Sequence, residues 1–237
     1  MMKIKNYAIS KDMKMSDLIL DNHFMILVLE RFGIELGLKN KTIETVCREN
    51  NVSTEVFLTI ANFQNNKTYI PELSLKFSAI KEIIQYLKKS HQYYTDEVFP
   101  DIMANIHLMS EYNQKPEMQM VERFFDEYKR EVDQHFDYEN EIAFPYALSL
   151  FENRKLTGSA NDYSVMDYKE HHDDIEAKLD DLKKLLIQHL PQKRDCVIRR
   201  KILFALFSLE QDLVVHAKIE NDILVPMVEK MEIKNKA

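Results

Sequence analysis

Two eleven-residue stretches of this chain carry the same pattern of polar residues. HFDYENEIAFP occupies residues 135–145, and HAKIENDILVP occupies residues 216–226. Each begins with His, has Glu four residues later, continues with Asn, an acidic residue and Ile, and ends on Pro. Residues four apart lie one above the other on the same face of an α-helix. The repeat therefore predicts two equivalent helices, each of which turns one imidazole and one carboxylate toward a shared interior.

The repeat extends beyond these stretches into the apolar residues of both helices. Steps of alternately three and four residues follow the inward face of a packed helix. Such steps pair each residue of the first helix with one 81 residues later. The first series is Val121, Phe125, Tyr128, Val132, His135, Glu139, Ile142 and Tyr146, and the second is Ile202, Leu206, Leu209, Leu213, His216, Glu220, Ile223 and Met227.

The same offset relates two further series, which we expect on the other two helices of a duplicated hairpin. It pairs His91 with His172, and it selects His172 over the adjacent His171 because only His172 keeps the rhythm. His91 precedes His135 by 44 residues, as His172 precedes His216. About 20 residues up one helix and 20 back return an antiparallel chain to the same height. The two series are Ile80, Ile84, Leu87, His91, Tyr94 and Val98, and Val165, Tyr168, His172, Ile175, Leu179, Leu182 and Leu186.

Composition and turn residues favour an all-α fold. The 237 residues include only three Gly and six Pro, and they are rich in helix-forming side chains. Breaker residues at 110–118, 153–162 and 189–195 separate four long periodic segments. These segments predict an antiparallel four-helix bundle over residues 73–237, built from the duplicated helical hairpin.

A small N-terminal helical domain is expected before the bundle. Residues 16–63 have the periodicity of short helices, and Ser53 is a candidate N-cap for one of them. Asn and Pro residues interrupt the periodicity over residues 65–73. The predicted domains are therefore residues 1–72 and 73–237.

The six polar groups on the inward faces point to a metal site. Two buried carboxylates would cost several kcal/mol without compensation, and a bound cation removes that penalty. Two metal ions bridged by the carboxylates, each with two imidazoles, use all six groups, and this donor set suits iron, with manganese or zinc as substitutes. A duplicated network of polar core residues is the alternative. The expected ligands are His91, His135, Glu139, His172, His216 and Glu220.

Other residues near the repeat receive less specific roles. Tyr94 either lines the metal site or packs as a core aromatic. Asn140 and Asn221 recur in the repeat but lie off the inward series, so we expect them at the helix surface or in support of the ligands. Pro145 and Pro226 are expected to kink or end their helices. Four histidines fall outside the pattern and are expected to face solvent or to pack generically, namely His23, His107, His171 and His189.

Charge and hydropathy argue against several classes of partner. The formal net charge is −7, and no segment has the basic excess that nucleic-acid binding requires. The N-terminus lacks the apolar core of a signal peptide, and no stretch approaches the roughly 20 apolar residues of a membrane span, so we expect a cytoplasmic protein with no membrane contact. Cys47 and Cys196 are the only cysteines, and their spacing argues against a disulfide framework or a thiolate cluster.

The motifs of this chain resemble the hemerythrin-like HHE cation-binding domain. The matching segments are SHQYYTDEVFPDI, HFDYENEIAFP, YSVMDYKEHHDDIEAKL and HAKIENDILVP. With the short helical domain before the bundle, the layout is similar to the RIC family of di-iron proteins for the repair of iron centres. The resemblance implies a non-haem di-iron centre, Fe2+ or Fe3+, held by the six residues named above. The two glutamates would bridge the ions, with an oxo bridge as an option.

The resemblance also implies a function. No further histidine lies in register to supply the extra ligand of oxygen-carrying hemerythrins, so the RIC type is the closer match. Such a protein would repair iron-sulfur proteins damaged under nitrosative or oxidative stress, with O2, peroxide or NO bound at open iron positions. A gas- or iron-binding module without catalysis and a purely structural metal are alternatives. The sequence leaves open whether the protein is an enzyme, which residue is catalytic, and whether it forms a homodimer.

One segment departs from the RIC pattern. Those proteins usually carry a Cys-Cys-Gly-Gly type motif after an N-terminal helix, whereas this chain has RFGIELGLKNKTIETV. Gly37 and Leu38 stand where the cysteines are expected. Thiol chemistry through this segment is therefore not expected, and Cys47 is expected to pack as a small apolar residue.

Overall fold

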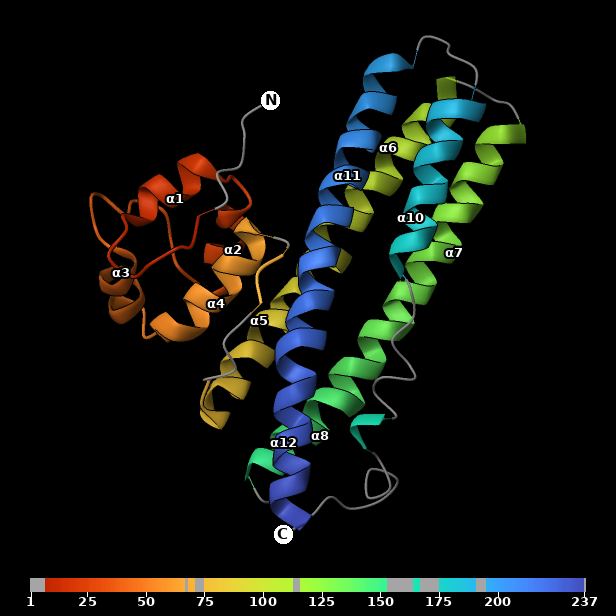
Figure 1. Ribbon diagram of the computed structural model, residues 1–237. Helices are drawn as coiled ribbons and strands as arrows, with labels where there is room; N and C mark the ends of the chain where they lie inside the picture. Colours follow the sequence, from red (N-terminus) through yellow and green to blue (C-terminus); the bar gives the residue numbers. More distant parts are fainter. Residues whose placement is uncertain are drawn as a thin grey trace. The chain divides into compact units, whose positions relative to one another are not determined.

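The protein is all-α over the residues that its computed structural model describes, which are 7–66, 68–70, 75–112, 116–152, 164–166, 175–190 and 195–236. This part of the chain contains no β-strand, which confirms the expected fold class (Figure 1). The chain divides into two compact units. The first comprises Met1–Ser90, Tyr146–Gly158 and Val215–Ala237, and the second comprises His91–Pro145 and Ser159–Val214. The expected domain boundary at residue 72 lies outside the described residues.

The first unit begins with four short helices whose ends are set by polar side chains. The Ser53 hydroxyl accepts a hydrogen bond from the Val56 N–H, which confirms Ser53 as an N-cap, and Thr42 accepts one from the Thr45 N–H. Asn22 ends one helix, and its side-chain oxygen accepts a hydrogen bond from the Phe24 N–H. The helices are α1 (Met15–Asp21), α2 (Met25–Arg31), α3 (Ile43–Glu49) and α4 (Thr54–Asn65).

These helices contact the start of α5 (Ile80–Tyr93) within the same unit. The Ser53 N–H donates a 2.8 Å hydrogen bond to Glu82 Oε1, and Arg31 Nη1 donates to the Tyr86 hydroxyl at 3.3 Å. In a capping box, a Glu in the first turn of the same helix accepts the hydrogen bond from the N-cap N–H. Here Glu82 of α5 accepts it instead. Burial raises the pKa of Glu82, and the hydrogen bond from Ser53 opposes that rise.

The second unit contains four long helical segments around one apolar core. Its helices include α6 (Phe99–Tyr112), α7 (Pro116–Tyr138), α10 (Ile175–Lys184) and most of α11 (Cys196–Ile219) (Figure 1). Most described members of the expected inward series that lie in this unit are buried, so the three-four periodicity identified them correctly. They include Val121, Phe125, Tyr128, Val132, Leu179, Leu182, Leu186, Ile202, Leu206, Leu209 and Leu213.

The described residues contain one π-helical turn at Leu185–His189, directly after α10, and three more at which one α-helix passes into the next. These three are Tyr94–Val98, Glu139–Ala143 and Glu220–Leu224. Each closes with a hydrogen bond from an N–H to the carbonyl five residues earlier, rather than four. An α-helix follows each turn without a break: α6 in the first case, then α8 (Phe144–Glu152) and α12 (Val225–Lys236).

A proline explains why the turn widens at these places. Pro100, Pro145 and Pro226 are each the second residue of the α-helix that follows a π turn. Proline has no N–H to donate, and its ring displaces the carbonyl four residues earlier. The wider turn accommodates both effects. The helices continue beyond Pro145 and Pro226, so neither proline ends its helix, which was one of the two expected outcomes.

The structure corrects one expected core position. Ile142 lies inside the turn and is 41% exposed, whereas Ala143 and Phe144 are buried in its place. On this helix the inward position therefore lies four or five residues after Glu139 rather than three. Its counterpart in the repeat, Ile223, is fully buried as expected.

The repeat thus supplies a matched pair of substitutions. Ile142→Ala should lower the free energy of unfolding by about 0.5 kcal/mol or less, as for most surface changes. Ile223→Ala should lower it by about 2–5 kcal/mol, because it leaves a cavity in the core. Urea denaturation of both variants under one set of conditions measures the difference. Equal losses would show that the inward face continues through Ile142.

The two cysteines occupy opposite environments. Cys47 is fully buried, which confirms that it packs as a small apolar residue, and Cys196 is exposed. Burial raises the pKa of the Cys47 thiol to about 11. Since the thiolate is the reactive form, Cys47 should be inert near neutral pH.

Alkylation tests this contrast directly. Iodoacetamide at pH 8 should modify the native protein once per chain, at Cys196, and Cys196→Ser should remain unmodified. Both sites should react after unfolding, because Cys47 then regains the ordinary thiol pKa of about 8.5. Mass spectrometry of the intact chain counts the adducts. Rapid native modification of Cys47 would contradict its burial.

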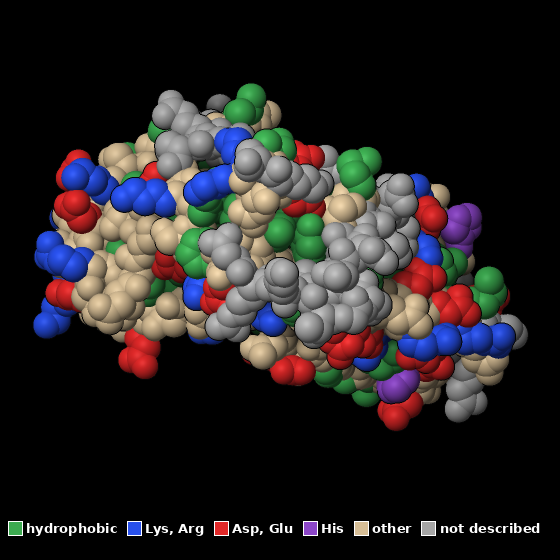
Figure 2. Space-filling model, turned by 90° about the horizontal axis from the view of Figure 1, so that it is seen from below, with side chains coloured by type: hydrophobic (Ala, Val, Ile, Leu, Met, Phe, Trp, Pro, Cys, Tyr) green, Lys and Arg blue, Asp and Glu red, His purple; other side chains and the backbone are tan. Residues whose placement is uncertain are grey.

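The surface mixes charges of both signs. Figure 2 shows Lys and Arg side chains interspersed with Asp and Glu on the face that it displays. Several of these charges form exposed pairs, including Lys11 with Glu44 and Lys184 with Asp180. In the part of the chain that the structure describes, no helix is long and apolar enough to cross a membrane.

Candidate metal centre

Three of the expected ligands meet within the second unit. His91 lies near the end of α5, His135 lies near the end of α7, and Glu139 is the first residue of the π turn that follows. The carboxylate of Glu139 is fully buried and meets a different imidazole at each oxygen. Oε2 lies 3.3 Å from His91 Nε2, and Oε1 lies 3.3 Å from His135 Nε2.

The second copy of the motif has the same local geometry. His216 lies in the last turn of α11, and Glu220 is the first residue of the π turn that follows. His216 Nε2 is 3.2 Å from Glu220 Oε1, and both side chains are buried. Spacing by four on one helix face explains this contact, as it explains the contact of His135 with Glu139.

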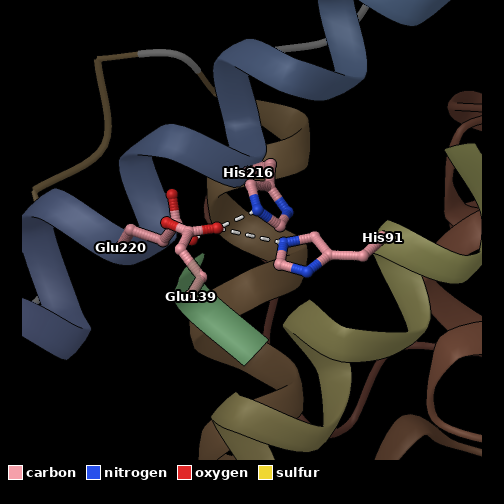
Figure 3. A group of neighbouring side chains, drawn as sticks. All are labelled: His91, Glu139, His216 and Glu220. Carbon is pink, nitrogen blue, oxygen red and sulfur yellow. Dashed lines mark ion pairs between the residues drawn. The ribbon is translucent and has the colours of Figure 1, made fainter. Parts of the chain in front are cut away.

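Four of these side chains are buried, and each offers one candidate ligand atom. Figure 3 draws His91 and Glu139 of the second unit, and His216 and Glu220 of the first. Ligand atoms about 2.0–2.2 Å from a shared ion and at right angles to one another are about 3 Å apart. The imidazole-to-carboxylate distances of 3.2 and 3.3 Å match that spacing. Each His–Glu pair therefore has donor atoms at the spacing of two ligands of one metal ion.

The donor set indicates which metals fit. Imidazole nitrogen and carboxylate oxygen, without thiolate, suit iron, manganese or zinc. The carboxylates of Glu139 and Glu220 are both fully buried, and a bound cation would offset the cost of burying them. The residues present thus fit the iron that the sequence predicts.

The His91 ring is held on several sides within the second unit. It stacks on Phe136 with 4.0 Å between ring centroids and an interplanar angle of 12°, and it also stacks on Phe144 at 5.7 Å. Its second nitrogen, Nδ1, lies 3.3 Å from Asn140 Oδ1. The sequence did not predict Phe136 or Phe144 at the site, since neither belongs to the three-four series.

The remaining expected residues fall into three groups. His172 lies outside the described residues, as does His171. His23, His107 and His189 are exposed, as expected for histidines outside the constellation. Tyr94 is buried in the core of the second unit, where it stacks on Phe136 at 5.8 Å. Phe136 therefore stacks on both Tyr94 and His91.

Comparison with known proteins places the domain. The model of the hemerythrin HHE cation-binding domain matches residues 82–228, which is more than half of the chain. The chain belongs to the hemerythrin HHE cation-binding domain family. This result confirms the resemblance found in the motifs, and the matched range contains both copies of the repeat. Cation binding is the property for which this family is named, and the buried His and Glu side chains are candidates to provide it.

One curated protein is similar over nearly the whole chain. It is the iron-sulfur cluster repair protein ScdA of Staphylococcus haemolyticus, which is 18% identical over 219 residues. The alignment covers 91% of this chain and 97% of that protein. The similarity therefore includes the N-terminal helices as well as the hemerythrin HHE domain.

Substitution of the buried carboxylates tests the metal centre. Glu139→Gln and Glu220→Gln keep the side-chain volume but remove the charge, so each variant should lose most of its bound metal. Elemental analysis after reconstitution with iron measures the metal per chain. Glu141→Gln is the matched control, because Glu141 lies in the same π turn and is exposed. Unchanged metal content in both test variants would contradict the proposed ligands.

Proposed function

We propose that this protein is a non-haem di-iron protein that takes part in the repair of iron-sulfur clusters during nitrosative or oxidative stress. The observation that carries this proposal is the pair of buried His–Glu contacts, one in each copy of the repeat, in a chain that aligns with ScdA over 91% of its length. These contacts support iron binding. The alignment supports the repair role.

The contacts of Glu139 favour two ions rather than one. A bridging carboxylate places one oxygen on each ion, and the two oxygens of Glu139 meet the imidazoles of His91 and His135 separately. By the symmetry of the repeat, Glu220 would be the second bridge. His91, His135, His172 and His216 would supply the imidazoles, with manganese or zinc as substitutes for iron.

The chain's own residues would bind and shield the metals. Glu139 and Glu220 would offset part of the positive charge of the ions, and the rings of Phe136 and Phe144 would keep water from one side of His91. Iron, when bound, would supply a change between Fe2+ and Fe3+ and coordination positions open to O2, peroxide or NO. We place this activity in the cytoplasm, with damaged iron-sulfur proteins as partners.

The N-terminal helices would act without a cysteine pair. Gly37 has a φ of +99°, a conformation that favours glycine, so a cysteine at this position would be strained. Cys47 is fully buried and cannot reach a cluster on another protein. Any repair by this chain would therefore depend on the metal centre rather than on thiols of the N-terminal helices.

Reactivation of a damaged enzyme tests the repair role. Iron-loaded protein should restore the activity of an iron-sulfur enzyme that has been inactivated by nitric oxide. His135→Ala should fail to do so, because it removes an imidazole that contacts Glu139. His107→Ala should match the unmodified protein, because His107 is an exposed histidine of the same unit.

The outcomes separate the proposed function from its alternatives. A purified protein that takes up no iron would contradict the di-iron centre itself. Full iron content with no reactivation would instead favour a module that binds a gas or iron without catalysis. Equal reactivation by His135→Ala would show that the metal centre does not carry the repair.

A further inference from the structure

We propose that Asn140 is a positioning residue that fixes the orientation of the His91 ring, so that Nε2 rather than Nδ1 is the metal ligand. This inference rests on the proposed metal centre. It assigns a role to the Asn that follows Glu139 in the repeated motif, and all the residues concerned lie in the second unit.

The two nitrogens of His91 have different neighbours. Nδ1 lies 3.3 Å from Asn140 Oδ1, and Nε2 lies 3.3 Å from Glu139 Oε2. An amide oxygen can only accept a hydrogen bond, so Nδ1–H must be the donor in this contact. In a neutral imidazole that proton leaves the lone pair on Nε2. Nε2 is also the nitrogen that faces the buried carboxylate.

The aromatic rings alone cannot make this choice. Phe136 and Phe144 stack on His91 with interplanar angles of 12° and 17°, and they hold the plane of its ring. Rotation of the imidazole by 180° keeps the same plane but exchanges nitrogen and carbon positions. Stacking is nearly indifferent to that exchange, whereas a hydrogen bond is not. Asn140 therefore supplies the discrimination that the rings lack.

Two adjacent residues of one π turn contact the His91 ring. Glu139 and Asn140 are the first two residues of the turn, and both contact the same imidazole through its opposite nitrogens. A hydrogen bond to the outer nitrogen of a metal-ligating imidazole also makes the ligand more basic. Loss of such a contact typically lowers metal affinity by about 10–100-fold.

Two nearly isosteric substitutions separate positioning from packing. Asn140→Leu removes the acceptor, and Asn140→Asp keeps an acceptor oxygen and adds charge. Asn105→Leu is the matched control, because Asn105 lies on α6 and its amide donates a 2.7 Å hydrogen bond to the Asp101 carbonyl. The full-length chain would be loaded separately with zinc, which suits NMR because it is diamagnetic, and with iron. The readouts are zinc affinity, the His91 Nδ1–H resonance and the midpoint potential of the iron.

The expected results differ among the variants. Asn140→Leu should weaken zinc binding by about 10–100-fold and abolish slow exchange of the His91 Nδ1–H proton. Asn140→Asp should retain zinc and lower the iron potential, because an anionic acceptor makes the imidazole a stronger electron donor and favours Fe3+. Asn105→Leu should leave all three readouts unchanged.

Each contrary result has a distinct meaning. Wild-type zinc affinity and a slowly exchanging Nδ1–H in Asn140→Leu would overturn the positioning role. Equal loss of zinc in Asn140→Asp and Asn140→Leu would also overturn it, since packing rather than the acceptor would then matter. A wild-type chain that binds neither zinc nor iron would overturn the metal centre, and the positioning role with it.

Discussion

The burial of two carboxylates among apolar helices is the constraint around which the metal centre is organised. Glu139 and Glu220 have no exposed surface, and an ionised carboxylate in such a place is tolerated only with charged or hydrogen-bonding partners. The imidazoles of His91 and His135 lie 3.3 Å from the Glu139 carboxylate, and that of His216 lies 3.2 Å from the Glu220 carboxylate. A bound cation would complete the compensation, so the stability of the core and the binding of metal depend on the same atoms.

The wider helical turns connect this constraint to the backbone. Two of them begin at the buried carboxylates themselves, and a third begins three residues after His91. Turns of this kind are rare and occur frequently at functional sites. Here a proline near the start of the next helix accounts for each of these three, because it prevents the ordinary hydrogen bond. The helix then continues, and the residues beyond the ligand are rotated relative to a regular α-helix.

The comparison with ScdA bears on how such a centre would be used. The two chains align over nearly their full lengths, so the N-terminal helices belong to the shared layout. This chain nevertheless has glycine at position 37 in a left-handed conformation, and its Cys47 thiol is buried with a pKa of about 11. Both facts argue against thiol chemistry at Gly37 and Cys47, in agreement with the proposal that the metal centre carries the function.

The sequence alone determined the helical class, the periodic core and the identity of the motif residues. Helical spacing depends only on local geometry, and the 81-residue repeat is visible in the order of the residues themselves. Tertiary structure decided what local spacing could not. Ile142 and Ile223 are equivalent in the repeat, yet one is exposed and the other buried, since burial depends on which elements pack against each helix. The contact of Asn140 with His91 joins residues 49 apart in the chain, so it became visible only when the two helices were brought together.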